Sequence, residues 1–207
     1  MDILAHGLWT NAVFESAAQA KKRKRSRKDT WIAVFFGVAP DLFSFGIFFV
    51  INLFTTGTLW PYAQARIKSE LAELAQNSAI ISDNLIKAPA GPPDPSLIPS
   101  YVYTLYDFTH SLVIFAGIFL VLWLLRGRPY WLIGGWGLHI VTDVFSHSDK
   151  FFPTPLLFPF SETHVNGISW ADPIFMVVNY SFLIAVYLWL YKFRKRPEVR
   201  YTESPNA

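Results

Sequence analysis

The sequence predicts an all-α integral membrane protein, a single helical bundle of four to five transmembrane helices over residues 1–207. Of its 207 residues 52% are hydrophobic and 17% aromatic, which is too apolar for an ordinary soluble domain. Several apolar runs approach or exceed the roughly 20 helical residues that cross a bilayer. Basic residues are concentrated: 14 of the 18 Lys and Arg lie in segments 21–28, 126–128 and 192–200. Such clusters are typical of cytoplasmic loops beside membrane spans.

Residues 3–20 are half apolar, and they predict either a polar-faced membrane helix or an interfacial one. His6 and Thr10 are four residues apart and share a helical face. The basic run at 21–28 follows directly and indicates a loop against anionic headgroups. A nucleic-acid-binding patch is the weaker interpretation because no binding fold accompanies this run.

Residues 31–54 predict a full span that contains one acidic residue, Asp41, near mid-depth. A carboxylate there costs about 2.5 to 3.5 kcal/mol, so it requires a compensating partner. Pro40 predicts a kink that turns this carboxylate inward. The structural alternative is that Asp41 caps the second half of a broken helix.

Residues 55–107 predict a long loop on the outer side of the membrane. Within it, helical spacing of apolar residues over 62–77 predicts a short amphipathic surface helix. Five prolines over 88–100 predict an extended linker.

Residues 103–125 form the next predicted span, with Asp107 and His110 one helical turn apart at its outer mouth. The basic residues at 126–128 place the following connection on the same side as the first basic run.

The stretch 130–160 concentrates ionisable residues in an apolar, aromatic run. His139, Asp143 and His147 are spaced four apart, so on a helix they lie along one face. Ionisable residues in a segment this apolar indicate a functional site, and His with Asp at i and i+4 is a common pair of metal ligands. The plainer interpretation is that His139 and Asp143 only bond each other or a neighbouring helix.

A loop over 147–172 is followed by the last predicted span, 173–193, and by a disordered tail at 197–207. Basic segments then alternate with outer loops through the whole chain. If 3–20 crosses the membrane, this topology brings ionisable residues from four segments to a similar depth.

The chain has no cysteine, so a metal would be held by His, Asp or Glu. With nitrogen and oxygen donors only, zinc is the first expectation, with manganese or iron as alternatives.

Four local motifs together resemble the YdjM-like family of predicted membrane-bound metal-dependent hydrolases. They are His6-Gly7, Pro40-Asp41, Thr109-His110-Ser111, and the stretch from His139 to Asp143 that is followed by "LLFPFS". The resemblance implies a multi-pass protein of the bacterial inner membrane with a His/Asp metal centre. Its implied ligands are His6, Asp41, His110, His139 and Asp143. The chain departs from the family after Pro40-Asp41 and before Thr109, where further acidic and basic residues are often found.

These features together predict a hydrolase that acts on an ester or phosphoester of a lipid-linked or amphiphilic substrate through a metal-activated water. His147 or Asp107 would move the proton. A non-enzymatic transport, proton-relay or scaffold protein with a structural His/Asp metal site is the alternative. The lipid bilayer is the expected partner, and no nucleic acid is expected.

Overall fold

The computed structural model describes residues 1–57 and 98–192, and within them it contains helices, turns and loops but no strand. The predicted all-α class is therefore confirmed for the described residues. The elements in chain order are α1 (Ile3–Ala20), α2 (Arg27–Asp41), the π-helix η1 (Leu42–Gly46), α3 (Ile47–Thr56), α5 (Ser100–Thr109), α6 (Leu112–Arg126), the 3₁₀ turn η3 (Trp131–Ile133), α7 (Gly134–Ser146) and α8 (Pro173–Lys192).

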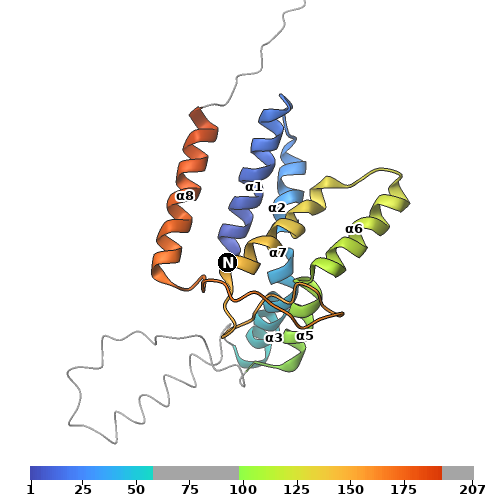
Figure 1. The fold of residues 1–207 in the computed structure, drawn as a ribbon, viewed down its shortest axis with the longest axis vertical. Coiled ribbons are helices and arrows are strands. Elements are labelled where there is room, and N and C mark those ends of the chain that lie inside the picture. Colours follow the sequence, from blue (N-terminus) through green and yellow to red (C-terminus); the bar gives the residue numbers. More distant parts are fainter. Residues whose placement is uncertain (58–97, 193–207) are drawn as a thin grey trace, which may run out of the picture.

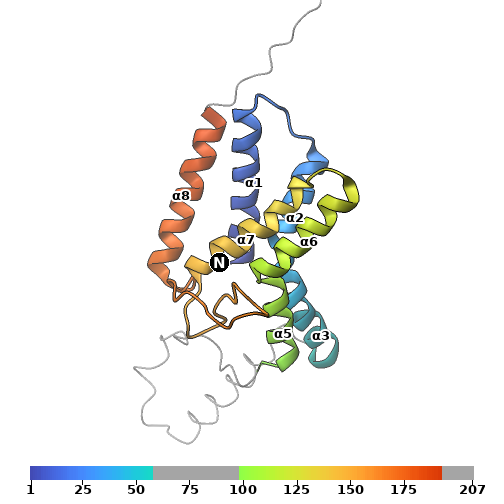
Figure 2. The same cartoon turned by 45° about the vertical axis from the view of Figure 1, so that its right-hand side comes forward.

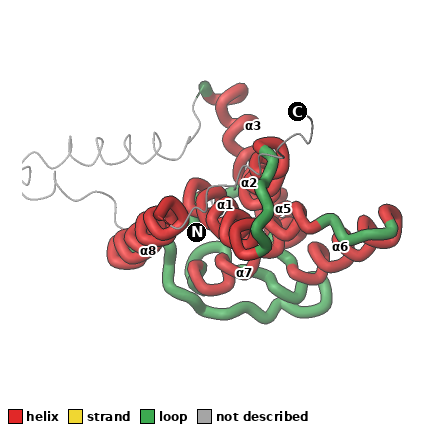
Figure 3. The backbone as a smooth tube through the Cα atoms, turned by 90° about the horizontal axis from the view of Figure 1, so that it is seen from above, coloured by secondary structure: helices red, strands yellow, loops and turns green. Residues whose placement is uncertain are grey.

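Helix α1 is central to the bundle and packs against α2, α7 and α8. Helices α1 and α8 run side by side, while α7 crosses obliquely against α2 (Figures 1 and 2). Seen from above, α6 extends away from the other helices (Figure 3). None of its residues is buried, which leaves an apolar helix facing outward.

Two helical segments are long and apolar enough to cross a membrane: the continuous segment Arg27–Thr55 and helix α8. A third span is formed if α5 and α6 are taken together, although they are bent by 54°. Two to three candidate spans, together with large exposed apolar side chains on α6 and α8, indicate a membrane protein.

Several expected boundaries differ from the structure. The predicted span 103–125 is two helices, because the chain breaks at His110 and Ser111. The predicted loop 55–107 is shorter, since its last residues belong to α5. The predicted surface helix at 62–77, most of the linker at 88–100 and the tail at 197–207 lie outside the described residues.

The basic connections lie at one end of the molecule. The α1–α2 connection, the α6–α7 connection and the C-terminal end of α8 are all at the top of Figure 1. Trp31, the fifth residue of α2, and Trp131, the first residue of η3, are 72% and 68% exposed. Exposed tryptophan next to basic residues is typical of a membrane–water interface.

Helix α8 accommodates the polar residues of α1. Trp9 donates its indole N–H to Asn179 at 2.8 Å, and Asn11 donates to the Tyr187 hydroxyl at 2.9 Å. In an apolar environment these bonds remove the cost of the unpaired groups. The polar face of α1 is therefore directed into the bundle.

Pro40 lies directly before the irregular turn of the second helical segment. Proline has no N–H and disturbs the helical hydrogen-bond ladder, and the next residues form the π-helix η1. The Ser44 hydroxyl donates to the Pro40 carbonyl at 2.9 Å, which satisfies a buried acceptor at this turn. The local change in winding occurs immediately after Asp41.

Candidate metal centre

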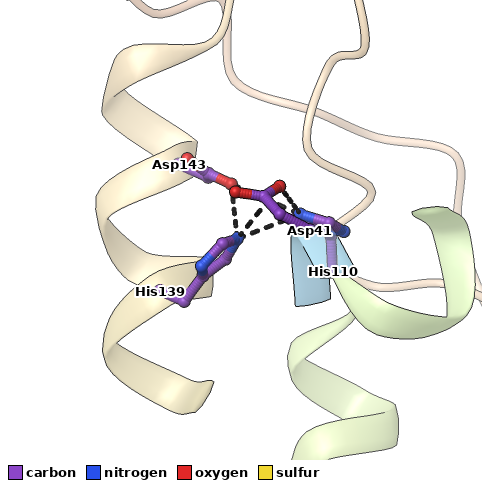
Figure 4. Close-up of side chains that lie close together, drawn as sticks. All are labelled: Asp41, His110, His139 and Asp143. Atoms are coloured by element: carbon purple, nitrogen blue, oxygen red, sulfur yellow. Dashed lines mark hydrogen bonds and ion pairs between the residues drawn. The ribbon is translucent and has the colours of Figure 1, made fainter. Parts of the chain in front are cut away.

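Asp41 is the last residue of α2, and its carboxylate is directed at two histidines. Its Oδ1 atom lies 3.5 Å from His110 Nε2 and 3.7 Å from His139 Nε2 (Figure 4). The side chain makes no capping hydrogen bond at the start of η1. The capping interpretation of Asp41 is therefore wrong in this structure.

Helix α7 supplies His139 and Asp143 from successive turns, as their spacing predicts. His139 Nε2 lies 3.1 Å from Asp143 Oδ2. The other ring nitrogen, Nδ1, lies 2.7 Å from the carbonyl oxygen of Gly37, so α2 orients the ring. Both residues are buried.

His110 lies in the break between α5 and α6, and the predicted span 103–125 is therefore interrupted at this residue. It is completely buried, and its ring stacks on Tyr106 with centroids 3.8 Å apart. Trp136 donates its indole N–H to the Thr109 carbonyl at 2.6 Å, which holds the break against α7. The bend turns the imidazole to face Asp41 and His139 (Figure 4).

Two more histidines approach the other oxygen of Asp143. His6 Nε2 lies 3.0 Å and His147 Nε2 lies 3.4 Å from Asp143 Oδ1. His6 also stacks on His139 with centroids 3.6 Å apart. The amino nitrogen of Met1 contacts the same carboxylate oxygen at 2.5 Å.

The hydrogen-bond network assigns one tautomer to all four rings. Every Nδ1 atom faces an oxygen that acts as an acceptor, and these oxygens are Thr142 Oγ1 for His6, the Tyr106 carbonyl for His110, the Gly37 carbonyl for His139 and the Phe152 carbonyl for His147. The Thr142 hydroxyl is an acceptor because its own proton is directed to the backbone carbonyls of α7. Each ring is therefore assigned a proton on Nδ1, and in its neutral form it presents the Nε2 lone pair to Asp143.

This assignment leaves the centre with acceptors facing acceptors. The Nε2 atoms of His110 and His139 are 3.1 Å apart, and both carry lone pairs. Asp143 Oδ2, also buried, lies 3.1 Å from His139 Nε2 and receives no hydrogen bond while that ring is neutral. Two carboxylates and several lone pairs in a buried space require positive charge for stability.

A divalent metal ion fits these residues. One atom each from Asp41, His110, His139 and Asp143 lies within 4.8 Å of the others. Five separations among them are 3.1 to 3.7 Å. Ligand atoms about 2.1 Å from a tetrahedral zinc ion are themselves roughly 3.4 Å apart. The cluster could therefore bind a metal.

No family model, curated protein or solved structure matches this chain. The interpretation of the centre consequently depends on its own geometry.

All five residues expected to bind metal, and one of the two expected to move a proton, come together in the structure. The group is His6, Asp41, His110, His139, Asp143 and His147. Asp107 is half-buried, and among the described residues no hydrogen bond or ion pair joins it to this group. A proton-transfer role for Asp107 has no support from this arrangement.

Residues that orient the histidines were missed by the sequence interpretation. Gly37 and Tyr106 act through backbone carbonyls, and Thr142 through its hydroxyl. The sequence contains a signal for two of them. Gly37 is one helical turn before Asp41 and Tyr106 is one turn before His110, so each lies on the same helical face as a predicted ligand. Thr142 is three residues after His139, on a neighbouring position of the same helix.

The loop over residues 147–172 caps the C-terminal end of α7 with hydrogen bonds. Gly167 N–H donates to the His147 carbonyl at 2.8 Å, and Trp170 N–H donates to the Ser146 carbonyl at 2.8 Å. These bonds satisfy carbonyls that the end of a helix leaves open. The loop also supplies the Phe152 carbonyl that orients His147.

Proposed function

We propose that this chain is a membrane-embedded, divalent-metal-dependent hydrolase of the YdjM-like family that it resembles. Asp41, His110, His139 and Asp143 hold the ion. Two imidazole nitrogens with two carboxylate oxygens favour zinc, with manganese or iron as alternatives.

One observation carries the proposal. The Nε2 atoms of His110 and His139 are 3.1 Å apart, and they lie 3.5 Å and 3.1 Å from the buried Oδ2 atom of Asp143. With both rings neutral and no cation, the two lone pairs face each other and the buried carboxylate oxygen receives no donor from either ring. A divalent ion removes both costs at once.

The bound metal supplies a Lewis acid that polarises an ester or phosphoester oxygen and makes a water molecule more acidic. His6 and His147 direct their Nε2 atoms at Asp143 Oδ1, so in the neutral form either is suited to accept a proton. The carbonyl of Phe152 keeps the His147 ring in the orientation for this role.

The substrate proposed for this centre is lipid-linked or amphiphilic. In the proposed topology α1 and α7 join the candidate spans, giving four to five crossings of a bacterial inner membrane with the basic end in the cytoplasm. The centre then lies towards the outer leaflet, where headgroups with ester and phosphoester bonds are abundant. Nucleic acid has no role in this proposal.

Burial favours one alternative, a structural metal site in a non-enzymatic protein. The side chains of His110, His139 and Asp143 are at most 1% exposed, whereas that of Asp41 is 15% exposed. Structural sites are closed, while catalytic ones keep a position open for water. In the hydrolase, water and substrate would reach the metal past Asp41, the most exposed of the four ligand side chains.

The test is hydrolysis by detergent-purified protein of p-nitrophenyl phosphate, bis-p-nitrophenyl phosphate and a p-nitrophenyl fatty-acid ester. We expect activity that is lost with a chelator, restored by zinc and absent in His139→Ala. His164→Ala is the matched control, because His164 is exposed and bonded only to a loop carbonyl within the described residues.

Tightly bound metal without hydrolysis of any probe would favour the structural alternative. Protein that is folded but binds no metal would contradict both.

A further inference from the structure

The carboxylate of Asp143 faces two different groups of donors. Its Oδ2 atom lies 3.1 Å from His139 Nε2 and 3.5 Å from His110 Nε2. Its Oδ1 atom instead faces His6 Nε2 at 3.0 Å and His147 Nε2 at 3.4 Å. One carboxylate therefore lies between two pairs of imidazoles.

The Nε2 atoms of His6 and His147 converge on one oxygen of Asp143. His6 Nε2 is buried 3.0 Å from Asp143 Oδ1, and only 2% of the residue is exposed. Both rings are held through Nδ1, by Thr142 Oγ1 and by the Phe152 carbonyl, so neither can present an N–H to Asp143 without becoming charged. Two imidazole nitrogens held beside one carboxylate oxygen are a ligand set of the kind that binds divalent metal ions.

A positive group already lies at this position. The amino nitrogen of Met1 is 2.5 Å from Asp143 Oδ1 and 3.1 Å from His147 Nε2. The charge and the lone pairs here therefore suit a cation. A proton or this amine can satisfy them through hydrogen bonds. A metal ion that displaced the amine would instead be coordinated by both imidazoles and the carboxylate together.

We propose that His6, His147 and Asp143 Oδ1 bind a second divalent metal ion, with Asp143 bridging the two ions. The proposal rests on the metal centre of the proposed function and deepens it. In such a centre His147 is a metal ligand, and proton transfer passes to water or substrate. Metal pairs about 3.5 to 4 Å apart are common in phosphoesterases and peptidases. Among the ester classes considered above, phosphoesters are therefore the preferred substrates.

The test combines metal counting with electron paramagnetic resonance of detergent-purified protein loaded with Mn²⁺. We expect two Mn²⁺ per chain in the wild type, with the broadened signal of an exchange-coupled pair. His6→Gln and His147→Gln should each retain one ion and show the hyperfine pattern of an isolated Mn²⁺. His164→Ala should retain the pair.

One uncoupled ion in the wild type would overturn the second site and leave the proposed function intact. No bound ion would defeat both proposals. Two ions that persist in both glutamine variants would show that the second ion lies elsewhere. Should a variant fold poorly, as judged by size-exclusion chromatography, the wild-type count and spectrum still decide the question.

Discussion

Each histidine of the centre is held through Nδ1, which commits its Nε2 lone pair to the interior of the cluster. A ring that is positioned in this way loses little freedom when it binds an ion. The i and i+4 spacing of His139 and Asp143 predicts only that they share a face. The spacing does not show that they belong to one site. The structure shows this, because the Gly37 carbonyl and the His110 ring, which come from other segments, both contact His139.

Replacing His110 or His139 by alanine should remove most of the metal bound at the site of Asp41, His110, His139 and Asp143, and the double variant should lose little more from that site. Ligands of one ion act as a unit, because a deficient site has already lost its affinity when the first ligand is removed. Metal analysis after gel filtration measures this effect, with His164→Ala as the control. Small losses that add in the double variant would indicate separate hydrogen bonds and no shared ion.

Close helix packing positions these residues. A Cβ atom at Gly37 would collide with the side chain of Thr10, and one at Gly135 would collide with the carbonyl of Ala33. Glycine at both positions allows α1, α2 and α7 to approach closely, which small residues commonly do between membrane helices. The Gly37 carbonyl reaches His139 only because of this approach.

Gly37→Ala and Gly135→Ala should therefore destabilise the protein by about 1 to 3 kcal/mol, the usual cost of overpacking. Gly117 in α6 is a matched control, since a Cβ there meets no atom within 4 Å. Gly117→Ala should be neutral or stabilising by up to about 1 kcal/mol, because alanine favours helix. Thermal unfolding in detergent gives the comparison. Equal effects at all three positions would argue against close packing at α2 and α7.

The pattern of apolar and polar residues predicts the positions of the helices well, but it does not predict where a helix is interrupted. The apolar and polar pattern of residues 3–20 predicts the helix that the structure has as Ile3–Ala20. The break after Thr109 was missed, because the apolar run continues through it. Ser111 carries a signal for it, since its side chain accepts from Ile114 N–H as a helix N-cap. His147 lies beyond the end of α7, so its contact with Asp143 depends on the loop that follows.

Across the whole molecule, the basic connections share one end and the 147–172 loop lies towards the other (Figure 1). The positive-inside rule therefore predicts that this loop faces outward. The natural absence of cysteine makes the prediction simple to test.

A single cysteine at Thr163→Cys should react with a membrane-impermeant maleimide in intact cells. Lys24→Cys should react only after the membrane is disrupted. Both positions are exposed, so accessibility in the folded protein is matched. The reverse labelling pattern would invert the topology and move the metal centre towards the cytoplasmic leaflet.

Helix α6 has a consequence for the surrounding lipid. It is 15 residues long, which corresponds to about 22 Å, whereas the hydrocarbon layer is about 30 Å thick. A lipid-facing helix that is too short is matched by local thinning of the bilayer. The ligand His110 is two residues before the start of α6, so thinning at this end would draw headgroups closer to its depth. The bilayer itself would then shorten the path from a lipid headgroup to the metal.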